Sequence, residues 1–176
     1  MAHFNITSTH GLVGAVVNFS LVLLIYVVNL NLMAEWWFAI LALLVLAVVM
    51  FTGTIATRKA NGNSLSFGQA WLASMSVAFV AQVVTAILTG VLYYMIAPEL
   101  PDILTEITLE KTRTTMESFG LSGDLLEAQM KELRDTMQEV YTWKGLLKNS
   151  AGGMVMWAFV SLIVAAVCKR RSQEFV

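Results

Sequence analysis

Charged residues are missing from four long stretches of this chain, and their absence is the first constraint on its fold. No Asp, Glu, Lys or Arg occurs in residues 1–34, 36–57, 60–98 or 149–168. A charge at the centre of a bilayer costs roughly 3 kcal/mol or more, and about 20 apolar residues cross the hydrocarbon core. Stretches of this length argue against a soluble domain and predict helices that span a membrane.

Cysteine, histidine and proline are also scarce. The single cysteine, Cys168, excludes an internal disulfide, and two histidines without a cysteine cluster give no metal-site spacing. The two prolines, Pro98 and Pro101, stand together after the third uncharged stretch and mark its end. The net charge is only −1, so nothing in the composition indicates a nucleic-acid partner.

Four spanning helices are therefore expected, at about residues 11–32, 36–57, 66–96 and 149–168. Ser66 followed by Gln69 just before an apolar stretch has the spacing of a capping box, which predicts where the third helix begins. Only residues 31–35 separate the first two helices, so these two helices must run antiparallel.

Residues 99–148 differ from the rest of the chain, because they hold ten of its twelve acidic residues. Within them Leu126, Met130, Leu133 and Met137 recur at steps of four and three, which is typical of one apolar face of an amphipathic helix. An earlier helix is expected at 102–119, with Gly120 left-handed after it and Ser122 capping the second helix. The chain is thus predicted to be an all-α polytopic membrane protein with four transmembrane helices and an extramembrane helical hairpin between the third and fourth.

Basic residues set the expected orientation. Arg58 and Lys59 end the second helix and Lys169, Arg170 and Arg171 end the fourth, whereas acidic residues outnumber the basic ones in the hairpin. Lys and Arg beside spanning helices favour the cytoplasm. We therefore expect residues 1–97 to hold three transmembrane helices, 98–148 the hairpin, and 149–176 the last helix with a basic cytoplasmic tail. Both termini are then cytoplasmic, and in a bacterium with two membranes the hairpin is periplasmic.

Side chains that carry chemistry are few inside the predicted helices. They offer amides and hydroxyls but no charge, and Gln82 lies near the middle of the third helix. An interhelical hydrogen bond is the favoured interpretation of Gln82, and a contact with a substrate or lipid is the other. The missing ionisable residues argue against proton-coupled transport, and no G-x-S-x-G or H-E-x-x-H motif indicates an enzyme. We expect neither a cofactor nor a bound metal.

Four segments carry a family resemblance. They are NGNSLSFGQAW at 61–71, YYMIAPEL at 93–100, SFGLSGDLLEAQMKELRDTM at 118–137 and the closing KRR at 169–171. In this order they resemble a bacterial membrane-protein family catalogued as domain of unknown function 4199, over nearly the whole chain. The resemblance implies this architecture and a bacterial inner membrane, and it assigns no site residue.

Two functions fit these features. The first is a non-enzymatic accessory or structural subunit that binds a protein partner through the apolar face of Leu126, Met130, Leu133 and Met137. That face also fits packing on the sister helix or on the membrane surface. The alternative is a small transporter or channel built as a homo-oligomer, with Gln82 lining its path. The lipid bilayer is a partner in either case.

The expected orientation can be tested with reporters. A phosphatase that matures only in the periplasm should be inactive when fused after Val176 and active when inserted between residues 98 and 148. The reason is the density of basic residues beside the ends of the second and fourth helices. An external signal from the fusion after Val176 would overturn this orientation.

Overall fold

The structure, a computed structural model, describes residues 2–170 and the side chains from Asn5 onward. Its elements are α1 (Ala2–Val28), η1 (Leu30–Ala34), α2 (Trp36–Ala60), α3 (Phe67–Val91), η2 (Leu92–Ile96), α4 (Leu100–Ser118), α5 (Asp124–Val140) and α6 (Trp143–Cys168). The predicted all-α class is confirmed for the described residues. Arg171, the last member of the predicted basic cluster, lies outside them.

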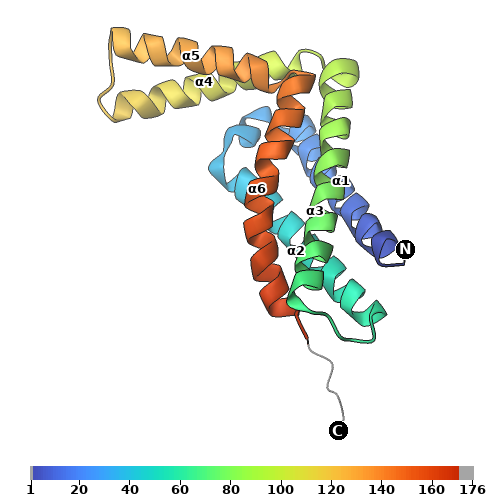
Figure 1. Cartoon of the computed structure of the whole chain (residues 1–176). Coiled ribbons are helices and arrows are strands. Elements are labelled where there is room, and N and C mark those ends of the chain that lie inside the picture. The colour runs from blue at the N-terminus through green and yellow to red at the C-terminus, as the bar shows by residue number, and fades with distance from the viewer. Residues whose placement is uncertain (1, 171–176) are drawn as a thin grey trace.

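Four helical segments are long and apolar enough to cross a membrane, as the sequence predicts. They are Asn5–Val28, Trp36–Ala60, Phe67–Ile96 and Trp143–Cys168. In the bundle that they form, α3 packs on α1, on α2 and on α6 (Figure 1). Large apolar side chains such as Val27, Phe159 and Ile163 are exposed on the outside of this bundle, where the acyl chains of a bilayer would cover them.

The buried face of α3 consists almost entirely of small residues. Its buried members up to the middle of the helix are Ala70, Ala73, Ser74, Val77, Ala78 and Ala81. Neighbouring helices approach this face through glycine: a Cβ on Gly11 of α1 would lie 2.7 Å from the Cβ of Val80, and one on Gly53 of α2 would lie 2.9 Å from a methyl carbon of Val77. Small residues allow backbones to approach closely, which is how helices associate where no water drives them together.

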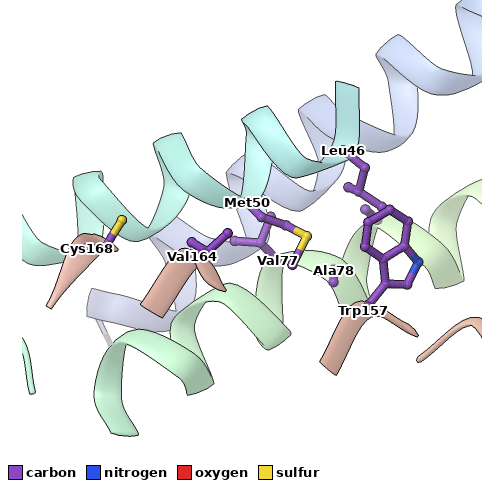
Figure 2. Packing of buried hydrophobic residues seen from close by; sticks show 8 residues of the cluster. Leu46, Met50, Val77, Ala78, Trp157, Val164 and Cys168 are labelled. Carbon is purple, nitrogen blue, oxygen red and sulfur yellow. The ribbon is translucent and has the colours of Figure 1, made fainter. Parts of the chain in front are cut away.

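Larger side chains fill the space beside this stripe in one half of the bundle. The cluster contributed by α2, α3 and α6 consists of Leu46, Met50, Val77, Ala78, Ala81, Trp157, Val164 and Cys168. It extends from Cys168 at one end to Trp157 at the other (Figure 2). We call this region the packed half of the bundle.

The end of the bundle beside Cys168 is closed by contacts between the α2–α3 turn and the residues after α6. Leu65 and Arg170 exchange two backbone hydrogen bonds of 2.8 Å each. The guanidinium of Arg58 donates to the carbonyl oxygen of Cys168 at 3.2 Å. The basic ends of the second and fourth helices therefore meet at one end of the bundle. Helices α4 and α5 lie across the opposite end (Figure 1).

Helices α4 and α5 lie side by side, antiparallel, and extend sideways from the bundle (Figure 1). We call these two helices with the turn between them the arm. Tyr93 meets Tyr141 edge to face with ring centroids 5.4 Å apart, and Tyr94 stacks on Trp143 at 5.3 Å. The Tyr94 hydroxyl also donates to the carbonyl oxygen of Tyr141 at 3.2 Å. Each aromatic pair joins the chain that leaves α3 to the chain that returns into α6, and such pairs add about 0.5–1.5 kcal/mol beyond their burial.

We call the four aromatic residues Tyr93, Tyr94, Tyr141 and Trp143 the elbow. Two glycines make room for it: a Cβ on Gly90 would lie 2.1 Å from the Trp143 ring, and one on Gly145 would lie 2.0 Å from the carbonyl oxygen of Glu139. Burial raises the pKa of the Tyr141 phenol, so this ring carries no charge at neutral or moderately alkaline pH. The elbow fixes the direction of the arm relative to the bundle.

Two helix starts differ from the sequence prediction. Helix α1 begins at Ala2 instead of residue 11, so it includes polar residues such as Thr9, whose hydroxyl donates to the Asn5 carbonyl oxygen at 2.8 Å. Helix α6 begins at Trp143 instead of residue 149, because the Thr142 hydroxyl caps it by accepting the Gly145 N–H at 3.0 Å. The capping box that starts α3 is confirmed, with both of its hydrogen bonds present.

Substitution of Gly145 should loosen the elbow. In Gly145→Ala the new methyl collides with a backbone carbonyl, and overpacking of this kind costs about 1–3 kcal/mol. Purified protein should therefore melt at a lower temperature and be cleaved faster at residues 141–145. Gly152→Ala is the matched control on the same helix, because a Cβ at Gly152 would have no contact within 4 Å. Equal stability of the two variants would show that the elbow tolerates this displacement.

Candidate functional site

The arm is held together by an apolar seam between its two helices. Leu109 of α4 packs against Leu126 and Met130 of α5, and Met116 and Leu133 cover the sides of this cluster. Leu126 and Met130 are only 4% and 8% exposed. The seam is small and contains residues of α4 and α5 alone, so its burial stabilises the pairing of these two helices.

The four candidate docking residues of α5 lie largely on this seam. Leu126 and Met130 are buried, Leu133 is half-buried against the same cluster, and Met137 is half-buried outside it. At Leu126, Met130 and Leu133 the structure shows packing on the sister helix α4, which was the other interpretation of this face. A partner can reach Leu126 and Met130 only if the arm opens.

Ion pairs flank the seam. Arg113 of α4 contacts Glu127 at 2.5 Å, and Arg134 of α5 contacts Glu106 at 2.7 Å. All four side chains are at least 44% exposed, so each pair contributes at most about 1 kcal/mol. These pairs set the register of the arm, and the apolar seam supplies its stability.

A separate contact ties the arm to the bundle. The Lys111 ammonium of α4 forms an ion pair with Glu35, the residue between η1 and α2, and donates to the carbonyl oxygen of Asn31 at 3.1 Å. Together with the elbow, which joins the two ends of the arm, this contact attaches the arm to the bundle at two separate places.

The far end of the arm is a tight turn. The Gly120 N–H donates to the Glu117 carbonyl and the Leu121 N–H to the Met116 carbonyl, which is a Schellman ending with Gly120 at φ +85°. The left-handed Gly120 is therefore confirmed. The predicted cap at Ser122 is wrong: Gly123, at φ +68°, precedes α5 and provides no side-chain cap, so the helix starts one residue later.

Two apolar side chains stand out at this turn. Phe119 is 79% exposed and Leu125 is 61% exposed. Leu125 lies one position, or about 100°, away from the seam residue Leu126, so it points off the packed face. We call Phe119 and Leu125 the tip. Periodicity alone does not find them, because it identifies the buried face and leaves the exposed side chains unranked.

A cleft of about 370 Å³ opens between α1, α2, α3 and α6, on the arm side of the packed half. Its polar lining residues are Asn18, Gln82 and Thr85. Most of its wall is apolar and includes Val22, Phe38, Ile40, Leu43, Met156 and Trp157. None of the lining residues carries a charge.

The polar groups of the cleft have unused hydrogen-bonding capacity. Asn18 donates one bond, to the carbonyl oxygen of Gly14 at 3.3 Å. The Gln82 amide and the Thr85 hydroxyl form no hydrogen bond with any described residue. The favoured interpretation of Gln82, an interhelical hydrogen bond, is therefore not seen. Instead, Gly153 of α6 leaves space for this amide: a Cβ there would lie 3.0 Å from Nε2 of Gln82.

Comparison with known proteins gives one match. A family model described as "Protein of unknown function (DUF4199)" matches residues 9–170. No curated protein and no solved structure matches the chain significantly. The matched range includes the whole arm, α2, α3, α6 and α1 from residue 9 onward.

The seam and the tip can be separated by adjacent substitutions. Leu126→Asp places a charge in the seam and should destabilise the arm by about 3 kcal/mol or more. Amide hydrogen exchange in α4 and α5 should then accelerate while exchange in α1, α2 and α3 stays slow. Leu125→Asp is the matched control, since Leu125 is exposed. Fast exchange in both variants, or in neither, would mean that the seam does not hold the arm together.

Proposed function

The chain belongs to the DUF4199 family, whose description names no activity, and we propose that it is a non-enzymatic accessory or structural subunit that binds a protein partner through the tip of its arm. The observation that carries this proposal is the pairing of a fixed arm with an uncovered apolar tip. The elbow and the Lys111 contacts hold the arm, while Phe119 and Leu125 are largely exposed.

A fixed arm favours binding for an energetic reason. Ordering flexible segments during association costs free energy, and a preorganised surface avoids that cost. Aromatic anchors near the centre of an interface commonly carry most of the binding energy. Phe119 is an aromatic side chain that follows α4 directly, in the turn between α4 and α5. This turn is the end of the arm farthest from the bundle (Figure 1). The tip therefore presents its anchor without rearrangement of the bundle.

The seam residues then act through the shape of the arm. Leu126, Met130 and Leu133 pack on α4 and so hold α5, which carries Leu125, against the helix that ends beside Phe119. Met137, half-buried and nearer to the elbow, lies outside that cluster. Charges at these positions release the partner because the arm opens, and substitutions at the tip release it with the arm intact.

We place the protein in the bacterial inner membrane, with both termini in the cytoplasm and the arm in the periplasm. Two features support this placement. Four spans return the chain to the side on which it began, and the basic residues Arg58, Lys59, Lys169 and Arg170 lie at the end of the bundle opposite the arm.

A small oligomeric transporter or channel is the second candidate, and the cleft beside Gln82 favours it. Its difficulty is the packed half, where Leu46, Met50 and Trp157 fill the bundle directly beyond the cleft. A path across the membrane would therefore have to form between copies of the chain.

Substitutions at the tip should abolish partner binding without unfolding the arm. The tagged protein is extracted gently from its native membrane, separated on a native gel and analysed by mass spectrometry. Phe119→Ser with Leu125→Asp should lower the recovery of a stoichiometric partner about tenfold or more, as expected for an anchor worth 2 kcal/mol or so.

Ile103→Ser is the matched control, because Ile103 is an exposed apolar residue of α4 near the elbow end of the arm. A photoreactive residue at position 119 should crosslink to the same partner. Retention of the partner by the tip variant would reject this docking surface, and recovery of a pure homo-oligomer would favour the transporter.

A further inference from the structure

The cleft beside Gln82 has the size and lining of a small-molecule binding site. Pockets that bind small molecules have volumes of about 300–1,000 Å³, mostly apolar walls and a few polar groups that orient the ligand. This cleft has about 370 Å³, apolar walls from α1, α2 and α6, and three polar side chains, two of them from α3. It begins where the packed cluster ends, at Leu46 and Trp157 (Figure 2).

The polar groups in the cleft differ from those in the packed half. Thr54 and Thr57 in α2 satisfy their hydroxyls on their own helix, at 2.7 Å and 2.9 Å from the carbonyl oxygens four residues earlier. The Thr85 hydroxyl and the Gln82 amide find no such partner among the described residues. Unpaired amides in an apolar environment cost free energy, so these groups are poised to bond something that enters the cleft.

The indole N–H of Trp157 adds a further donor. By contrast, the indole N–H of Trp71 in α3 donates to the carbonyl oxygen of Ala158 in α6 at 3.4 Å. Trp157 lines the cleft and donates to no described residue. Among the described residues, the buried hydroxyls of Ser8, Ser74 and Ser161 also lack a partner, but none of these three lines the cleft, and Ser74 and Ser161 are fully buried.

The glycine pair of α6 shows which side of that helix the site uses. A Cβ on Gly153 would lie 3.0 Å from the Gln82 amide nitrogen and 3.9 Å from the Trp157 indole nitrogen. Gly152 next to it would meet nothing within 4 Å. The missing side chain at Gly153 therefore keeps two donors of the cleft accessible.

These features restrict the chemistry of a ligand. No lining residue is ionisable, so the ligand is neutral at this depth. The amide N–H groups, the hydroxyl and the indole N–H are donors that match carbonyl oxygens, and Phe38 and Trp157 provide aromatic faces for a flat ring. Gln82 is the sixteenth residue of the 30-residue span Phe67–Ile96, close to the middle of the bilayer.

We propose that the cleft binds a neutral, lipid-soluble carbonyl compound with a long apolar tail, of the prenylquinone type. Ester carbonyls of glycerolipids share this chemistry, but they lie near the headgroups, about 15 Å from the middle of a 30 Å hydrocarbon core. A quinone ring on an apolar tail can reach Gln82. The site is separate from the tip of the arm, so each can fail without the other.

The test uses the full chain in phosphatidylcholine nanodiscs, titrated with decylubiquinone and followed by quenching of tryptophan fluorescence. Saturable quenching is expected, and it should fall strongly in Trp157→Phe. Gln82→Leu and Gly153→Val should each weaken binding about tenfold, because one removes the amide and the other fills its space. The matched controls, Thr89→Val for the polar side chain and Gly152→Val for the glycine, should bind as the parent protein does.

Stability without ligand gives a second readout. Gln82→Leu should leave the melting temperature of the empty protein unchanged or raise it, because the amide has no partner to lose. A clear drop would instead assign Gln82 to an interhelical hydrogen bond and overturn the proposal.

Two binding results would also overturn it: quenching that does not saturate, or equal affinity in Gln82→Leu and the parent protein. A glycerolipid that co-purifies with the parent and is lost from Gln82→Leu would reject the quinone and identify an ester carbonyl as the ligand.

Discussion

The close approach of α3 to three neighbouring helices is the constraint on which the rest of the structure depends. In lipid there is little hydrophobic drive between helices, so association rests on packing and on a few polar contacts. The stripe from Ala70 to Ala81 provides that packing, and Gly11 and Gly53 complete it from α1 and α2. Larger residues at these glycines would push the backbones apart, so that Met50 and Val164 could no longer pack against Val77 of α3.

The end of this stripe determines where the bundle opens. After Ala81 the next residues of α3 that face inward are Gln82 and Thr85, which line the cleft instead of packing on a neighbour. The buried face resumes at Gly90 and Leu92, where α3 meets the elbow and the start of the arm. The cleft therefore lies between two packed regions of the same helix, and its shape is set by both.

Patterns along single segments predicted most of the helices, whereas contacts between distant segments could not be predicted from the sequence. Exclusion of charge located the four spanning helices, and local spacing located the Ser66 capping box and the left-handed Gly120. The start of α6 was missed because Lys144 and Lys148 are charged and were assigned to the segment outside the membrane. The helix nevertheless begins before them, at Trp143, where the Thr142 hydroxyl caps it. The elbow joins Tyr93 and Tyr94 to residues nearly 50 positions away, which no periodic pattern reports.

The same partition of charge explains why the two candidate sites suit different ligands. Hydrocarbon excludes ionisable groups from the spans, so a site among Asn18, Gln82 and Thr85 can recognise only neutral hydrogen-bonding groups and shape. Outside the spans, water permits charged side chains such as Arg113 and Glu127 on the same arm as the exposed Phe119. Protein interfaces commonly combine an apolar core with a polar rim. Under the two proposals, one chain keeps a lipid-soluble ligand and a protein partner apart by their different depths relative to the membrane.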